Sequence, residues 1–249
     1  MTEKEQHNSV SQTPVPPPVV QDGIIKEDHP VPEYLKSVYG RRYFHPFFSK
    51  IFDDEWMAAI GSFFCQKKLT EWVTNEIFEG NDVLQLGVAS GNFEKRVAEK
   101  INGKGQYHIE DLSEFHIKAA QPRLSFWLNT SVMERDFTLP ETKHNKKYNA
   151  VIGYFLLHEL PDVRKRAVLQ RALNALKPGG KMIFVDYAQP KKFHPMKYPV
   201  KIFNRLFEPF AESLWHTDII DFLPKKDNLI WDRKTLFGDM YQCVIARKN

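Results

Sequence analysis

One segment constrains the fold of this chain more than any other, the run DVLQLGVASGNF at residues 82–93. Its first part, Asp82 to Gly87, has the composition of a short buried strand, and a helix is predicted at Glu94 to Ile101. Glycines in such a turn let the backbone approach a ligand closely, and the start of the helix supplies free N–H groups. The segment predicts a ligand-binding strand–turn–helix unit around Gly87 and Gly91, with an ordinary structural turn as the alternative.

Strands and helices alternate along the rest of the chain. An alternation of this kind is typical of a mostly parallel α/β sheet. The helix expected at 163–176 ends at the stop signal KPGG at residues 177–180. Further strands are predicted at 107–109, 148–155, 181–187 and 241–246.

The chain divides into a tail and one domain. Residues 1–32 contain six of the sixteen prolines, which predicts a disordered or polyproline-II tail. Residues 33–249 are expected to form a single α/β domain. Its parts would be N-terminal helices at 33–79, a core at 80–187, and a lid with the final strands at 188–249.

Composition excludes several classes of protein. Two cysteines among 249 residues are too few for a disulfide scaffold. A net charge of +4 is too small to indicate a nucleic-acid partner, so none is expected. The sequence has no apolar run near the roughly 18 to 20 residues that span a bilayer and no signal-peptide pattern, so we expect a cytoplasmic protein.

Two acidic residues follow predicted strands at positions that suit a nucleotide ligand. Asp111 comes twenty residues after Gly91, at the end of the second strand, where a carboxylate can accept hydrogen bonds from both ribose hydroxyls. Asp136 comes where a third strand is expected to end. The first of these signals is shared by dinucleotide-binding Rossmann domains and is weak by itself.

In combination, these segments resemble a class I S-adenosylmethionine (SAM) methyltransferase domain over residues 80–187. The resemblance implies a Rossmann-like α/β fold with a seven-stranded sheet and with SAM at the carboxyl ends of the first strands. It also implies that Asp111 holds the ribose, that Asp136 lies beside the adenine, and that Gln85, Gly87 and Gly91 border the cofactor.

Further motifs flank this domain on both sides. They are VPEYL at 31–35, YFHP at 43–46, VDY at 185–187, HP at 194–195 and FEPFA at 207–211. With these motifs the chain resembles the RquA family of rhodoquinone biosynthesis proteins over about residues 31–246. Members of that family are methyltransferase-like, and the resemblance implies conversion of ubiquinone to rhodoquinone by replacement of a ring methoxy group with an amino group. It further implies SAM as the amino donor and a manganese ion (Mn2+).

Gln85 stands where most SAM methyltransferases have an acid that helps to hold the ammonium group of the cofactor. A neutral amide leaves that amine easier to deprotonate than a carboxylate does, because a carboxylate favours the charged form. An ammonium group has no lone pair and cannot attack a quinone, so Gln85 fits amination. The alternative is that Gln85 only hydrogen-bonds the backbone of the loop.

The candidate catalytic residues are Tyr154, His158 and Tyr187, near the ends of the fourth and fifth strands. Manganese prefers carboxylate, imidazole and water ligands and can act as a Lewis acid on a carbonyl. The preferred ligand set is Asp186, His194 and His158, although no tight spacing motif supports it. The alternative is that these histidines are structural hydrogen-bonding groups.

A basic and aromatic segment at residues 185–206 favours contact with an anionic membrane surface. Its one acid is Asp186, and its five basic residues are Lys191, Lys192, Lys197, Lys201 and Arg205. We therefore expect a peripheral protein on the inner membrane, with ubiquinone as its partner. The alternative is a solvated face on an ordinary core helix.

Two other functions stay open. The first is a conventional SAM-dependent methyltransferase that acts on a quinone or a phenol. The second is a non-catalytic SAM-binding partner in a quinone-biosynthesis complex.

Overall fold

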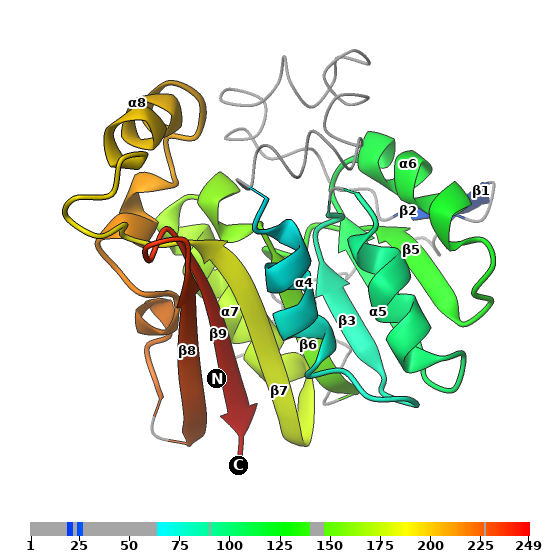
Figure 1. The fold of residues 1–249 in the computed structure, drawn as a ribbon. Coiled ribbons are helices and arrows are strands. Elements are labelled where there is room, and N and C mark those ends of the chain that lie inside the picture. Colours follow the sequence, from blue (N-terminus) through cyan, green and yellow to red (C-terminus); the bar gives the residue numbers. More distant parts are fainter. Residues whose placement is uncertain (1–18, 22–23, 27–63, 90, 140–146, 227) are drawn as a thin grey trace, which may run out of the picture.

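The computed structural model describes residues 19–21, 24–26, 64–89, 91–139, 147–226 and 228–249, which form one sheet with helices on both faces (Figure 1). The strands are β1 (Val19–Gln21), β2 (Ile24–Lys26), β3 (Val83–Leu86), β4 (Tyr107–Asp111), β5 (Thr130–Glu134), β6 (Tyr148–Tyr154), β7 (Leu176–Tyr187), β8 (Leu229–Leu236) and β9 (Tyr241–Lys248). The helices are α4 (Gln66–Thr74), α5 (Phe93–Ile101), α6 (Glu114–Leu124), α7 (Asp162–Ala175) and α8 (Lys197–Phe207). Short 3-10 helices are η2 (Leu157–Glu159), η3 (Glu212–Trp215) and η4 (Ile219–Phe222).

Seven of the strands follow the order β5-β4-β3-β6-β7-β9-β8. Neighbours are parallel from β5 to β7, whereas β9 runs antiparallel to both β7 and β8. This arrangement confirms the predicted seven-stranded Rossmann-like fold.

The β1–β2 hairpin extends the sheet beyond β5, where Lys26 pairs with Glu134. The prediction of a disordered tail is therefore wrong for these two strands, because the backbone of β2 takes up the free edge of β5. The rest of residues 1–32 lies outside the described residues, as do residues 33–63, where most of the N-terminal helices were predicted.

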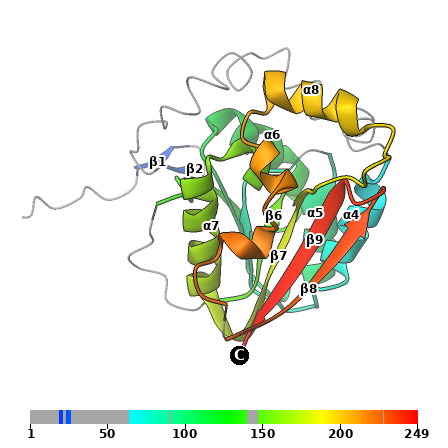
Figure 2. The same cartoon turned by 90° about the vertical axis from the view of Figure 1, so that its left-hand side faces the viewer.

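Two apolar cores lie on opposite faces of the sheet (Figures 1 and 2). Helices α4, α5 and α6 cover one face, and α7 with the 3-10 helices covers the other. Side chains alternate along β3, so Leu84 and Leu86 belong to the α7 core while Val83 belongs to the core under α5. By the same alternation Gln85 points toward α5.

The predicted element boundaries agree closely with the structure in the core and diverge outside it. The helix predicted at 163–176 corresponds to α7. The KPGG segment lies inside β7, where the pairing of β6 with β7 shifts register between the pairs Tyr148–Leu176 and Ala150–Lys181. Helix α6 and strand β8 were not predicted, because Pro122 interrupts the helical pattern of α6 and β8 is a half-exposed edge strand without apolar alternation.

The strand order has a topological switch point at the carboxyl ends of β3 and β6. The chain runs outward from β3 through β4 to β5 and then crosses back to β6 on the other side of β3, so the strand order reverses between β3 and β6. Open α/β sheets bind ligands at such switch points. Helix α8 lies at this same edge of the sheet (Figures 1 and 2). Of the helices in the described part of the chain, none has the length and apolar character needed to cross a membrane.

Candidate functional site

The glycine turn after β3 has the backbone geometry expected of a ligand-binding loop. Gly87 and Gly91 have φ angles of 79° and 74°, a region that L side chains rarely adopt. A Cβ atom on Gly87 would also stand 3.0 Å from Cδ1 of Leu156. Helix α5 begins two residues after Gly91, so its first N–H groups face the turn.

Gln85 lies beneath this turn in a fully buried hydrogen-bond network. Its Nε2 atom donates to the carbonyl oxygen of Gly87 at 2.9 Å and to Oε1 of Glu94 at 3.1 Å. The hydroxyl group of Tyr107 donates to Oε1 of Gln85. The amide thus does hydrogen-bond the loop backbone, which was the structural alternative. Glu94 of α5 brings a carboxyl group next to this amide, which the prediction for Gln85 did not include.

Glu94 is the residue that the sequence analysis missed in the cofactor region. It is 1% exposed, and its Oε1 atom accepts a hydrogen bond from the N–H group of Ala89 at 2.5 Å. Its Oε2 atom has no hydrogen-bond partner among the described residues. Burial raises the pKa of Glu94, since desolvation penalises the charged form. A buried carboxylate with an open acceptor suits a bound cationic group.

The two predicted nucleotide-binding acids lie where their strands end. Oδ2 of Asp111 accepts the N–H group of Val88 at 2.7 Å, and Oδ1 accepts that of Ser113 at 2.7 Å. A carboxylate has about four acceptor positions, so Asp111 retains capacity for hydroxyl groups. Oδ1 of Asp136 accepts the N–H group of Thr138 at 2.8 Å. Asp111 thus ties β4 to the glycine turn, as a residue beside a bound nucleoside would.

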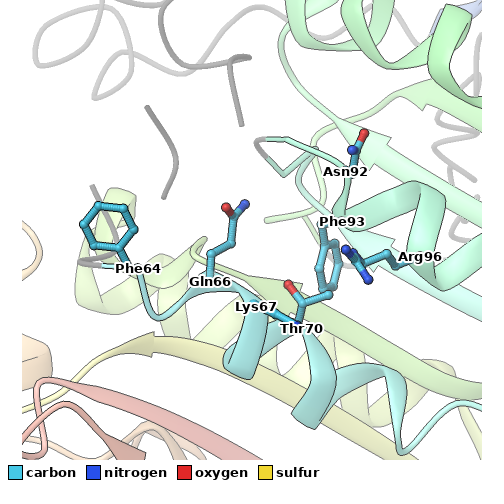
Figure 3. Close-up of a pocket in the computed structure, with 7 residues that line it drawn as sticks. All are labelled: Phe64, Gln66, Lys67, Thr70, Asn92, Phe93 and Arg96. Atoms are coloured by element: carbon cyan, nitrogen blue, oxygen red, sulfur yellow. The ribbon is translucent and has the colours of Figure 1, made fainter. Parts of the chain in front are cut away.

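A pocket of about 290 Å³ opens between the start of α4 and the start of α5 (Figure 3). Its lining carries positive charge at Lys67 and Arg96 and polar groups at Asn92 and Thr70. The complete lining is Phe64, Gln66, Lys67, Thr70, Asn92, Phe93 and Arg96. The pocket adjoins the glycine turn, so it is suited to an anionic or polar end of a ligand held there.

Tyr154 supports the wall of this pocket. Its ring stacks on Phe93 with centroids 4.0 Å apart. Its hydroxyl group lies 3.2 Å from Oγ1 of Thr70 and donates to the carbonyl oxygen of Gln66 at 3.4 Å. Burial raises the pKa of Tyr154, so the phenol stays neutral. The structure therefore places this predicted catalytic residue between β6 and α4, where it fixes the position of α4.

His158 and Asp186 form a buried ion pair at the ends of β6 and β7. Nδ1 of His158 lies 3.0 Å from Oδ1 of Asp186. Both carboxylate oxygens accept backbone N–H groups as well, from Leu157, His158 and Tyr187. Burial alone lowers the pKa of His158, but the charge and hydrogen bond of Asp186 outweigh it and raise the pKa to about 9. His158 is therefore protonated at neutral pH.

Aromatic rings surround this pair. The ring of Tyr187 lies 4.9 Å from that of His158, and Phe155 lies 6.3 Å from His158. Tyr241 of β9 lies within 6 Å of both Phe155 and Tyr187. We call Phe155, His158, Tyr187 and Tyr241 the aromatic cluster. Phe155 has a φ angle of 51°, an unusual conformation for a bulky residue that marks many functional sites.

The predicted metal set does not assemble. Among the described residues no three His, Cys, Asp or Glu side chains gather in a group that could hold a metal ion. The Asp186 oxygens and Nδ1 of His158 are occupied by hydrogen bonds, whereas His194 packs on Phe237 with ring centroids 4.8 Å apart. Nδ1 of His194 accepts the N–H group of Met196 at 3.2 Å. The set of Asp186, His158 and His194 is thus wrong, and these residues do not fit a manganese site.

Comparison with known proteins agrees with this geometry. Residues 83–180 match the family model of a methyltransferase domain. An uncharacterized methyltransferase of Geobacillus kaustophilus is 33% identical over 113 residues, which cover 44% of this chain and 48% of that protein. One from Anoxybacillus flavithermus is 28% identical over 120 residues, covering 47% of this chain and 53% of that protein. The chain thus spans about half the length of the curated relatives it matches.

Solved structures show the same fold at low sequence identity. The N-methyltransferase NodS of Bradyrhizobium japonicum, in complex with S-adenosyl-L-homocysteine, has a TM-score of 0.58 at 15% identity, with 87% of this chain and 99% of that chain covered. A SAM-dependent methyltransferase of Aquifex aeolicus has a TM-score of 0.55 at 17% identity, with 83% and 100% covered. An O-methyltransferase family protein of Burkholderia thailandensis has a TM-score of 0.66 at 13% identity, with 86% and 64% covered. The chain therefore has the fold of these class I SAM methyltransferase structures.

Proposed function

We propose that this protein is a SAM-dependent transferase that acts on a quinone ring and replaces a ring methoxy group of ubiquinone with an amino group. The observation that carries the proposal is the ion pair of His158 with Asp186 inside an aromatic cluster, at the same sheet edge as the glycine turn. The family resemblance supplies the identity of the quinone and of the product.

The residues around the glycine turn fit SAM. Gly87 and Gly91 allow close approach of the backbone, Asp111 can accept the ribose hydroxyls, and Glu94 offers a buried acceptor to the amino group of the methionine part, which must give up a proton before it can attack. When bound, SAM supplies a transferable methyl group or, in the proposed reaction, an amino group.

The aromatic cluster fits a planar, apolar ring. Aromatic side chains pack well against such a ring, and ligand sites usually combine apolar walls with a few polar groups. His158 supplies the polar group: Asp186 holds its Nδ1 atom, which leaves Nε2 as the second donor of the imidazolium. Burial raises the pKa of Tyr187, so its phenol is a neutral donor beside His158.

The protonation state of His158 favours amination over methylation of a phenol. In the amination the neutral donor amine adds to the methoxy-bearing carbon, the C–O bond breaks, and the methoxide takes up a proton, equal to the one that the amine gives up, and leaves as methanol. The C–N bond to the rest of the donor would then break as the neighbouring carbon of the donor loses a proton to the nitrogen, so that the donor fragment leaves as an alkene. A histidine with a pKa of about 9 holds that proton at neutral pH and can act as a general acid. Methylation of a phenol instead requires a base to remove a proton, which a protonated His158 cannot do.

A mass-spectrometric assay tests the proposal. The protein is incubated with SAM and a short-chain ubiquinone, with and without added manganese, and SAM binding is titrated in parallel. A product in which an amino group replaces a methoxy group supports amination. A product with one added methyl group would establish the conventional methyltransferase, and SAM binding without turnover would establish the non-catalytic partner.

A further inference from the structure

Helix α8 exposes the apolar side of an amphipathic helix. Only Val200 and Asn204 of its eleven residues are buried. Tyr198, Ile202 and Leu206 are 69%, 63% and 68% exposed, whereas such side chains normally face a core. A helix of a globular domain ordinarily places its apolar stripe inward, so this orientation requires an explanation.

The exposed side chains form two adjacent stripes along α8. Tyr198, Ile202 and Leu206 recur at intervals of four residues and therefore lie on one line along the helix. Phe203 and Phe207 widen this apolar stripe, with ring centroids 5.0 Å apart.

The second stripe is basic. Lys197, Lys201 and Arg205 precede the apolar residues by one position each, so they lie along the flank of the apolar stripe. The preceding segment adds Lys191, Lys192 and Phe193, all of them exposed. Nζ of Lys201 lies 3.6 Å from Oε1 of Glu212, and both side chains of this pair are exposed.

We propose that α8 and the preceding residues 191–196 form a docking surface for an anionic lipid bilayer. Charge complementarity selects this occupant: the basic stripe matches lipid phosphates, while the apolar stripe enters the boundary between headgroups and acyl chains. A protein partner with an apolar groove would not need five basic residues beside the contact.

The location of α8 gives the docking surface a role. It lies at the sheet edge that carries the glycine turn and the aromatic cluster (Figures 1 and 2). A bilayer bound there would face the candidate site, so an apolar substrate could pass from lipid to protein without crossing bulk water. The docking itself does not depend on which reaction the site catalyses.

Vesicle sedimentation of the full chain tests the proposal. Vesicles of phosphatidylcholine with about a third phosphatidylglycerol are compared with vesicles of phosphatidylcholine alone. We expect strong binding to the first only, weakened by salt. Each basic residue near an anionic surface contributes about a fivefold factor, so the triple variant Lys197→Gln, Lys201→Gln, Arg205→Gln should bind roughly a hundredfold more weakly. The double variant Ile202→Ser, Leu206→Ser should bind the anionic vesicles more weakly, because it removes apolar surface that would be buried in the bilayer.

Matched controls lie on other surfaces. The triple variant Lys95→Gln, Lys100→Gln, Lys118→Gln removes the same charge from α5 and α6 and should bind like the wild type. Phe126 and Leu128 are 84% and 98% exposed in the loop before β5, so Phe126→Ser with Leu128→Ser controls for loss of exposed apolar surface.

Hydrogen exchange of the wild-type chain gives a readout that needs no variant. Anionic vesicles should protect peptides covering 191–207 and leave those covering α5 unchanged. Equal binding to both kinds of vesicle, equal effects of the α8 and control variants, or protection elsewhere instead of at α8 would overturn the proposal. Self-association through α8, measured by light scattering without lipid, would also overturn it.

Discussion

The side-chain amide of Gln85, at the end of β3, donates a hydrogen bond of 3.1 Å to the carboxylate of Glu94 in the first turn of α5. The same carboxylate accepts the N–H group of Ala89 in the glycine turn. A carboxyl group thus lies beneath the turn, although position 85 of the strand carries a neutral amide. If SAM binds as proposed, Glu94 rather than residue 85 supplies the carboxyl group nearest to its amino group.

The first prediction concerns this carboxylate. Glu94→Gln should weaken SAM binding by about 1.5 to 3 kcal/mol, the range for a hydrogen bond to a charged group. The pKa of Glu94 is raised in the folded state, so folding favours the protonated carboxyl group. The free energy of unfolding therefore falls as pH rises from the unfolded-state pKa of Glu94 through its folded-state pKa. The uncharged variant should therefore be at least as stable as the wild type at neutral pH without SAM. Calorimetry and urea unfolding measure the two effects.

Exchanging the two residues provides the control for this prediction. The double variant Gln85→Glu, Glu94→Gln keeps one carboxylate and one amide in contact and should recover most of the SAM affinity. Glu99→Gln, at an exposed position of the same helix, should change neither quantity. Undiminished affinity in Glu94→Gln would refute the assignment.

The second prediction concerns Asp111. Asp111→Asn preserves the shape of the side chain but removes the charge that would face the ribose, and its amide nitrogen cannot accept the N–H group of Val88 or Ser113. SAM affinity measured by calorimetry should fall at least tenfold. Glu114→Gln, on the neighbouring exposed surface, is the matched control. Equal affinities in the two variants would contradict a ribose-binding role.

The third prediction concerns pH. The pKa of His158 rises from 6.5 to about 9 on folding, so the ion pair with Asp186 stabilises the folded state fully below pH 6.5 and loses that effect as pH rises to 9. The pKa shift corresponds to about 3 kcal/mol. The difference in free energy of unfolding between wild type and His158→Gln should shrink by about that amount from pH 6 to pH 9.5. Urea unfolding at several pH values measures it, and a constant difference would show that His158 is not charged. His216→Gln, at an exposed histidine, should change the free energy of unfolding little.

The fourth prediction concerns the segment that follows α8. Lys165 of α7 is fully buried and donates to the carbonyl oxygen of Phe210 at 2.8 Å and to Oγ of Ser213 at 2.5 Å. Lys165→Met should lower the free energy of unfolding by about 2 kcal/mol, because these acceptors lose a charged donor. Hydrogen exchange should increase first in residues 210–223. Arg166→Met, at the next and exposed position, should have little effect.

The local pattern of the chain was sufficient for the core of the fold. Apolar runs closed by glycine or by KPGG located β3, β6, α5 and α7 within a few residues, because strand and helix periodicity and stop signals are properties of neighbouring residues. The positions of the glycine turn and of Asp111 followed from the same local order. Strand β8 and helix α6 were not predicted because their sequences lack a clear apolar periodicity. Packing against neighbouring elements stabilises them instead.

Contacts between distant residues were decided only by the tertiary structure. The sequence alone determined that a strand, a glycine turn and a helix follow one another and that Gln85 replaces an acid. It did not determine that Glu94 turns inward to supply the carboxylate, that Asp186 pairs with His158 and leaves His194 apart, or that α8 turns its apolar stripe outward. Periodicity fixes which residues share a face of an element, whereas the partner of that face depends on how whole elements pack.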